Sequence, residues 1–172
     1  MEELALVEPM EDVEELEELE GKRRRKLRFP RNYVNTAKIS VSAFSDSRID
    51  LFNGSKNSRY DQYETGEVSK PTIITSVIIK KAPGTPAADF ETALYGATIR
   101  IEGNRGVVYL GTLDNLVWDG TSDKKNFRLP RGIFVPAGQK YTVIIEYLDN
   151  SKKNTLTSPV EMILRVEGVQ AA

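Results

Sequence analysis

Residues 141–147 read Tyr-Thr-Val-Ile-Ile-Glu-Tyr, and an extended chain would place on one face Tyr141, Val143, Ile145 and Tyr147. Side chains of a strand alternate between its two faces, so this spacing predicts a strand with one buried face. Residues 160–167, Val-Glu-Met-Ile-Leu-Arg-Val-Glu, alternate apolar with mainly charged side chains in the same way. Both stretches therefore predict half-buried β-strands.

The same period of two extends through most of the chain. Further strands are expected over residues 36–43, 48–52, 72–79, 97–102, 107–113 and 127–135, with one helical turn over 87–94. Because residues 72–79 are apolar or β-branched on both faces, we expect a central strand there. Seven or eight short strands separated by turns predict an all-β antiparallel sandwich or barrel. The long connections favour a single jelly roll over an immunoglobulin-like fold.

The first 31 residues differ from this pattern and predict a separate N-terminal arm. Residues 2–20 contain ten acidic side chains and no basic one, whereas residues 22–31 contain seven basic side chains and no acidic one. Residues 32–172 carry a net charge of only +2. We therefore expect a charged arm over residues 1–31 and a jelly-roll body over 32–172, with partner contacts made by the arm.

The acidic segment has an apolar stripe as well as charge. Pro9 precedes a stretch that ends at Gly21, and these residues suit the start and stop of a short helix. One face of that helix would carry Met10, Val13, Leu16 and Leu19. Docked in a groove, the stripe would bind a partner; the alternative is a solvated acidic tail.

The basic segment contains Lys22, Arg23, Arg24, Arg25, Lys26, Arg28 and Arg31. It could neutralise nucleic-acid phosphates, meet anionic lipid headgroups, or contact an acidic surface on a neighbouring subunit. It could also be a solvated linker. Because the whole arm is net acidic, with ten acidic and seven basic side chains, a simple genome-packaging tail is disfavoured and subunit contact ranks first.

Composition excludes several kinds of chemistry. The chain has no cysteine and no histidine, so disulfides, zinc–thiolate sites and Ser-His-Asp or Cys-His catalysis are excluded. No cofactor is expected. No apolar run is long enough for a transmembrane segment, and the start lacks the pattern of a signal peptide.

Two groups of loop residues are weaker candidates for chemistry. Carboxylate pairs occur at Asp46 with Asp50 and at Asp114 with Asp119, in turn-rich sequence where aspartate is expected for backbone reasons. Aromatic side chains on polar loops could stack on sugar rings, plug a neighbouring subunit or pack under their own loops; they are Tyr60, Tyr63 and Trp118.

Residues 127–147 join a proline–glycine corner to the long strand that opened this section. With the arm and the eight-strand pattern, this segment resembles single jelly-roll capsid proteins of tailless icosahedral bacteriophages. The resemblance covers about residues 36–167 and implies subunits that tile a shell, with arms running under neighbours. This chain departs from plant-virus-like RNA-binding arms, which are strongly basic, because its arm begins acidic. It also departs from nucleoplasmin-like chaperones, whose acidic tracts usually follow the body.

The leading hypothesis is a non-enzymatic structural virion protein, a capsid or capsid-associated subunit assembled in the host cytoplasm. Its partners would be copies of itself and other capsid proteins. One alternative is a decoration or cement protein of a tailed-phage head. Others are a carbohydrate- or ligand-binding module and a chaperone that binds basic proteins through residues 2–20.

Overall fold

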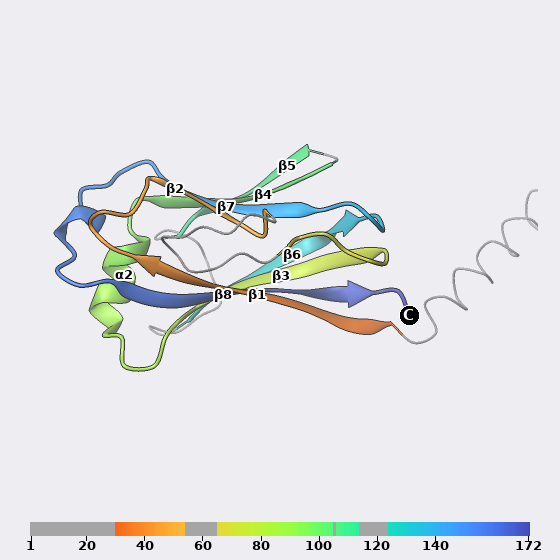
Figure 1. Cartoon of the computed structure of the whole chain (residues 1–172), viewed down its shortest axis with the longest axis horizontal. Coiled ribbons are helices and arrows are strands. Elements are labelled where there is room, and N and C mark those ends of the chain that lie inside the picture. Colours follow the sequence, from red (N-terminus) through yellow and green to blue (C-terminus); the bar gives the residue numbers. More distant parts are fainter. Residues whose placement is uncertain (1–29, 54–64, 105, 114–123) are drawn as a thin grey trace, which may run out of the picture.

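The computed structural model describes residues 30–53, 65–104, 106–113 and 124–172. Figure 1 shows a sandwich of two layers, with the beginning of the first strand and the end of the last strand side by side. Each layer is a four-stranded sheet. The expected all-β sandwich is therefore confirmed.

Sheet A is the layer that contains the first and last strands. Its order is β1 (Arg31–Val41), β8 (Val160–Gln170), β3 (Thr72–Lys81) and β6 (Lys124–Val135). Sheet B has the order β2 (Arg48–Leu51), β7 (Tyr141–Tyr147), β4 (Ala97–Gly103) and β5 (Gly106–Thr112). All neighbouring strands are antiparallel. The interior position of β3 confirms the expected central strand.

The strand pairs identify the topology. β1 pairs with β8, β2 with β7, β3 with β6, and β4 with β5. This is the pairing of one long antiparallel hairpin that has been rolled into two sheets, which is a jelly roll. The order also leaves β1 and β6 as the edges of sheet A, and β2 and β5 as the edges of sheet B.

Helical segments lie together at one end of the sandwich. The expected helical turn is an eight-residue helix, α2 (Ala87–Leu94), which buries Phe90, Ala93 and Leu94. A short 3₁₀ segment, η1 (Lys153–Thr155), lies against it. The opposite end holds the start of β1 (Figure 1).

Strand β1 begins at Arg31, five residues before the expected strand over residues 36–43. The reason is that its first inward side chains are polar: Tyr33 and Asn35 occupy the positions where an apolar residue would have signalled a strand. Pairing with β8 continues to Gln170 and holds these residues in the sheet. Residue 31, placed in the arm by its charge, is thus also the first residue of β1.

The core lies between the two inner faces. The inward side chains of β7 are the four predicted from the period of two, Tyr141, Val143, Ile145 and Tyr147. Those of β8 are Val160, Met162, Leu164 and Val166. All eight are buried. Ile144, on the other face of β7, is buried as well. Apolar burial of this extent is the main source of stability of the sandwich.

We expect Leu164→Ala to lower the free energy of unfolding by roughly 2–5 kcal/mol, because it leaves a cavity between the sheets. Urea denaturation followed by circular dichroism measures this. The control is Leu148→Ala, at a leucine that is 74% exposed, and it should change stability by less than about 0.5 kcal/mol. Equal losses in both variants would contradict the core assigned here.

Candidate assembly surfaces

A polar cluster joins the two sheets where β1 begins. Tyr33 and Asn35 on β1 meet Tyr141 on β7 inside the sandwich. The two tyrosine hydroxyl oxygens are 2.9 Å apart, and Asn35 Nδ2 donates to Tyr141 Oη at 3.1 Å. Asn35 Nδ2 also donates to the carbonyl oxygen of Thr65 at 3.1 Å. We call Tyr33, Asn35 and Tyr141 the clasp.

The clasp fixes the first residues of β1 against sheet B. Tyr141 is fully buried, and the ring of Tyr33 meets its ring edge-on at a centroid distance of 6.4 Å. Burial, followed by the hydrogen bond with Tyr33, raises the pKa of Tyr141 far above its usual range. The phenol is therefore neutral. Its hydrogen bonds join the beginning of β1, in sheet A, to β7, in sheet B.

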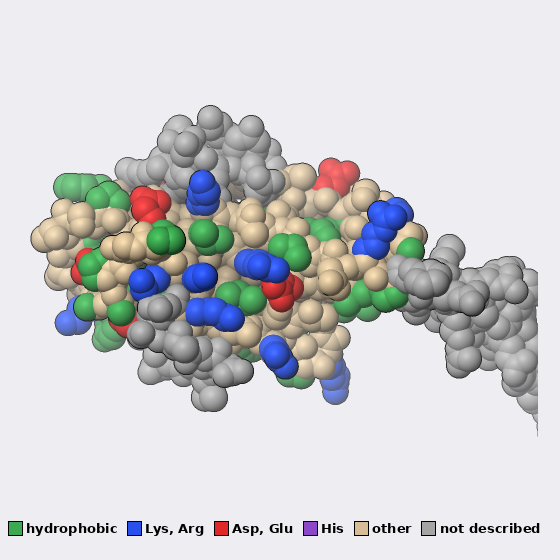
Figure 2. Space-filling model, turned by 90° about the horizontal axis from the view of Figure 1, so that it is seen from below, with side chains coloured by type: hydrophobic (Ala, Val, Ile, Leu, Met, Phe, Trp, Pro, Cys, Tyr) green, Lys and Arg blue, Asp and Glu red, His purple; other side chains and the backbone are tan. Residues whose placement is uncertain are grey.

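The outer face of sheet A is rich in basic side chains. Strand alternation and register place there five exposed basic residues and two acidic ones, Glu161 and Glu167. The basic residues are Lys38, Lys80, Lys124, Arg128 and Arg165. Figure 2, which views the molecule from the side of sheet A, shows Lys and Arg side chains gathered over the middle of the face. This face is a positive surface suited to an acidic partner.

One end of the same face is apolar. Ile73 on β3 is in register with Val169 on β8 and with Phe134 on β6. All three side chains are exposed, and they form a row across three strands at the end of the sheet where β1 begins. The outer face of sheet A is thus basic in the middle and apolar at the end where β1 begins.

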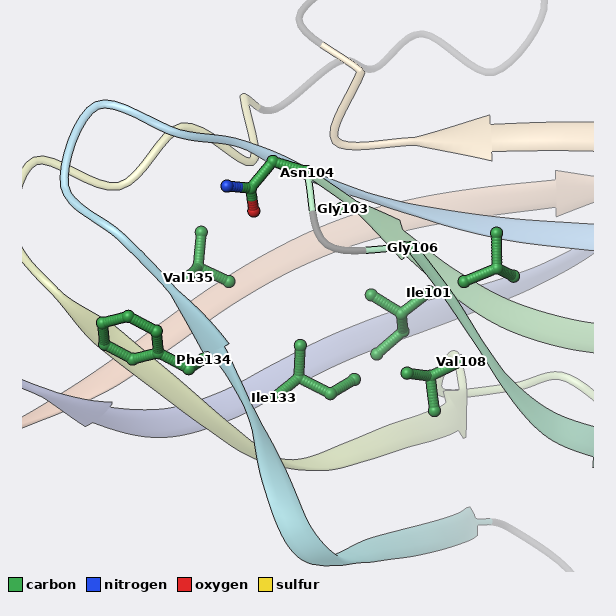
Figure 3. Close-up of a pocket in the computed structure, with 9 residues that line it drawn as sticks. Ile101, Gly103, Asn104, Gly106, Val108, Ile133, Phe134 and Val135 are labelled. Atoms are coloured by element: carbon green, nitrogen blue, oxygen red, sulfur yellow. The ribbon is translucent and has the colours of Figure 1, made fainter.

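An apolar hollow lies between the edge strands of the two sheets. One part, of about 80 Å³, is lined by residues of β4, β5 and β6, including Ile101, Val108 and Ile133 (Figure 3). A second part, of about 410 Å³, shares Val108 and Ile133 with the first. We call the two parts together the β5–β6 groove.

An irregularity in β6 shapes this groove. Ile74 of β3 pairs with Ile133, but Ser76, two residues along, pairs with Arg128. Residues 129–132 of β6 therefore leave the regular ladder, and they line the larger part of the groove. Gly132 has a φ of 65°, a left-handed conformation that favours glycine. A bulge of this kind bends an edge strand and turns side chains in a new direction.

The outer face of sheet B carries an ion-pair network. Arg100 on β4 is only 8% exposed. Its Nη1 lies 2.5 Å from Glu146 Oε2, and its Nε lies 3.0 Å from Glu102 Oε1. Hydrogen bonding to Glu146 raises the pKa of Arg100 above its usual value. One guanidinium thus serves two carboxylates, and its contact with Glu146 holds β4 to β7.

Few of the residues that sequence suggested for function fall in the described part of the chain. Arg31 is exposed at the first position of β1. Asp50 accepts a hydrogen bond from Arg48 Nε at 2.8 Å, and Asp46 lies exposed in the turn before β2. The other residues lie outside the described ranges: Met10, Val13, Leu16, Leu19, Lys22, Arg23, Arg24, Arg25, Lys26, Arg28, Tyr60, Tyr63, Trp118, Asp114 and Asp119.

Among the described residues, no cluster of three or more Asp, Glu, His or Cys side chains could hold a metal ion. Within the same ranges, the structure has no helix long and apolar enough to span a membrane.

Sequence reasoning missed the clasp, the positive face and the groove. Two of them left readable signals: polar Tyr33 and Asn35 at inward positions of a strand, and a strand at 124–135 with four basic residues and no acidic one. The groove left only the break at Pro130 and Gly132 as a signal, because its two walls meet only where the topology brings β5 near β6.

Comparison with known proteins gives similarities of structure only. No protein-family model matches the sequence, and no curated protein matches it. A chain of turnip yellow mosaic virus is similar over 83% of this chain and 82% of its own, with 8% identity and a TM-score of 0.32. The VP2 subviral particle of infectious bursal disease virus is similar over 84% of this chain, with 12% identity and a TM-score of 0.25. A structure of the Gx strain of that virus is similar over 82% of this chain, with 16% identity and a TM-score of 0.22.

This chain spans 42% and 39% of the lengths of the two infectious bursal disease virus chains. The assignment of the jelly roll therefore rests on strand order and pairing, as described above.

We expect Tyr141→Phe to lower the free energy of unfolding at pH 7 by about 1 kcal/mol, the usual worth of a hydrogen bond. The raised pKa of Tyr141 adds a pH dependence with a definite sign. The folded state keeps the phenol proton while the unfolded chain releases it above about pH 10, so wild-type stability falls there by about 1.4 kcal/mol per pH unit. The variant should lack this contribution.

Urea denaturation of both proteins between pH 7 and pH 11 measures the effect. The difference in stability should shrink and then reverse above about pH 10. Tyr95→Phe, at an exposed tyrosine outside the clasp, is the control and should follow the wild-type profile. A constant difference across the whole pH range would show that Tyr141 is not held neutral in the folded state.

Proposed function

We propose that this chain is a non-enzymatic structural subunit of a virion shell, either a capsid protein or a capsid-associated protein. One observation carries the proposal. The charged residues 2–31 lead directly into β1, an edge strand that the clasp holds to sheet B. Residues 2–20 bring ten negative charges, and residues 22–31 bring seven positive ones, to a body of net charge +2. Such a segment would contact a neighbouring molecule.

The surfaces of the body support the same proposal. The positive face of sheet A and the apolar β5–β6 groove offer two different surfaces for lateral contact. The pockets found between described residues have mainly apolar linings, as in the two parts of the groove. Enzyme and ligand sites combine an apolar cleft with a few convergent polar groups, so the groove fits a protein contact better than a reaction.

The partners in this proposal are copies of the chain itself and other capsid proteins. The basic segment, residues 22–31, would contact an acidic surface of a neighbouring subunit in preference to nucleic acid or anionic lipid. Capsid proteins of tailless icosahedral bacteriophages remain our finer assignment, supported by the eight-strand jelly roll and by residues 127–147, in which the proline–glycine corner leads into β7.

We expect the full chain to form large, concentration-dependent assemblies and a chain beginning at Pro30 to remain a small folded species. The shorter chain keeps all of β1, so a difference would be caused by the missing arm. Light scattering after size exclusion, with negative-stain images of the same fractions, measures the result, and circular dichroism checks the fold.

A full-length chain with five arm substitutions separates charge from length: Lys22→Gln, Arg23→Gln, Arg24→Gln, Arg25→Gln and Lys26→Gln. It should assemble less than wild type, because the attraction to an acidic surface is lost. If the full and shortened chains form the same small species at every concentration, self-assembly through the arm is wrong. A decoration protein, which binds only a finished shell, would then replace the present proposal.

A further inference from the structure

We propose that the β5–β6 groove binds residues 2–20 of a second copy of this chain. The inference rests on the proposed function and deepens it, because it names the surface that receives the arm. The groove is apolar and open at the side of the sandwich where the edge strands of the two sheets meet. Its exposed lining includes Val107 and Val108, which are 49% and 40% accessible.

The edge of β6 is built against strand addition. Residues 129–132 leave the ladder, and Pro130 has no backbone N–H to donate. Proline and a bulge are the usual features that prevent an edge strand from pairing with another strand. A segment bound here is therefore held through its side chains. Such binding suits an amphipathic helix, which inserts apolar residues spaced by three or four into a groove.

Residues 2–20 match these requirements in sequence. Met10, Val13, Leu16 and Leu19 follow each other at intervals of three. Lining residues on the groove side are aliphatic, including Val108, Leu129 and Ile133. Apolar side chains from the arm would thus find apolar partners, and this burial would supply most of the attraction.

Charge complementarity supports the same occupant. Strand β6 contains four basic residues and no acidic one, whereas residues 2–20 contain ten acidic residues and no basic one. Lys125 is engaged by Glu91 of α2 at 2.7 Å. Lys124, Arg128 and Arg131 are exposed. Arg131 lines the groove, and Lys124 and Arg128 lie on the adjoining outer face of sheet A. Charges at the rim of an interface chiefly speed association and select the partner.

The arm that occupies the groove comes from a second copy. The reason is the positive charge of residues 21–30, which connect residues 2–20 to β1. The chain's own arm joins β1, and β8 and β3 separate β1 from β6, a distance of about 14 Å. Residues 21–30 could span that distance, so length does not decide. Their path would cross the outer face of sheet A, where five basic residues outnumber two acidic ones. The six basic residues of this connecting segment would be repelled there.

Disulfide crosslinking of the full-length chain tests this proposal directly, since the wild-type sequence has no cysteine. A Leu16→Cys chain is mixed with a Val108→Cys chain under mild oxidation, and the heterodimer is followed on a non-reducing gel. The control replaces Val108→Cys by Leu148→Cys, a well-exposed residue outside the groove. Docking should make the first pair form at least ~tenfold faster, because it raises the effective concentration of the two thiols.

The double variant Leu16→Cys/Val108→Cys distinguishes a second copy from the chain's own arm. We expect it to form linked dimers and longer chains. A fast-migrating intramolecular product alone would overturn the assignment to a second copy. Equal crosslinking of Leu16→Cys to Val108→Cys and to Leu148→Cys would overturn the groove as the binding surface.

A charge reversal tests the basic edge. Arg128→Glu/Arg131→Glu in the Val108→Cys chain should slow crosslinking at least ~threefold at low salt, and Glu14→Lys/Glu17→Lys in the Leu16→Cys chain should restore it. Lys140→Glu/Lys152→Glu makes the same change of charge at exposed lysines outside β6 and outside the positive face of sheet A and should have little effect. If the reversal leaves crosslinking unchanged and instead weakens binding of a labelled single-stranded oligonucleotide, the edge contacts nucleic acid and the proposal is wrong.

Light scattering on the same mixtures separates this inference from the proposed function. Shells that form without selective crosslinking to Val108→Cys would leave the structural role standing and overturn the groove as the site of the arm. Selective crosslinking in a protein that forms only small species would support the groove and overturn the role as a shell subunit.

Discussion

The pairing of β1 with β8 is the constraint on which the rest of the molecule depends. These strands are 11 residues each, and they pair in unbroken antiparallel register from Arg31 with Gln170 to Val41 with Val160. The pairing joins segments that are more than a hundred residues apart in sequence. Because β8 also pairs with β3, it sets the order of sheet A and leaves β6 at the far edge. The jelly-roll topology follows from this pairing of the first strand with the last.

The same pairing positions the clasp and the groove. It brings the start of β1 to one end of the sandwich, where the clasp ties it to β7. It also leaves the groove on the other side of the molecule, between β5 and β6. The start of β1 thus lies at one edge of sheet A, and the apolar groove adjoins the other edge. Under the proposed function, identical copies would contact one another head to tail, which is the arrangement of a heterologous interface.

Much of the fold could be predicted from the sequence, because burial follows a period of two along β7 and β8. The jelly-roll order was supported only by the number of strands and the length of their connections, and the structure confirms it. The start of β1 was missed because Tyr33 and Asn35, which face inward, are polar. The local sequence records which side chains are apolar. It does not record that a buried tyrosine will find a hydrogen-bonding partner on the opposite sheet.

The candidate surfaces were harder to predict than the fold. The contrast between the charged segment and the body is visible in composition, since charge is a local property of sequence. A groove between two sheets depends on the relative position of β5 and β6, which lie in different sheets. The local sequence of each strand does not indicate the other. Pro130 and Gly132 indicated a break in an extended segment, and the structure shows that this break forms one wall of the hollow.

The distance in sequence between β1 and β8 also has a consequence for the order of events during synthesis. A ribosome makes residues 1–41 long before residues 160–170, so β1 cannot find its main partner until translation has passed residue 170. Non-local pairings of this kind form slowly, since the loop must close before the contacts stabilise it. The charged segment, residues 2–31, is thus complete, with its ten acidic and seven basic side chains, while the sandwich is still open.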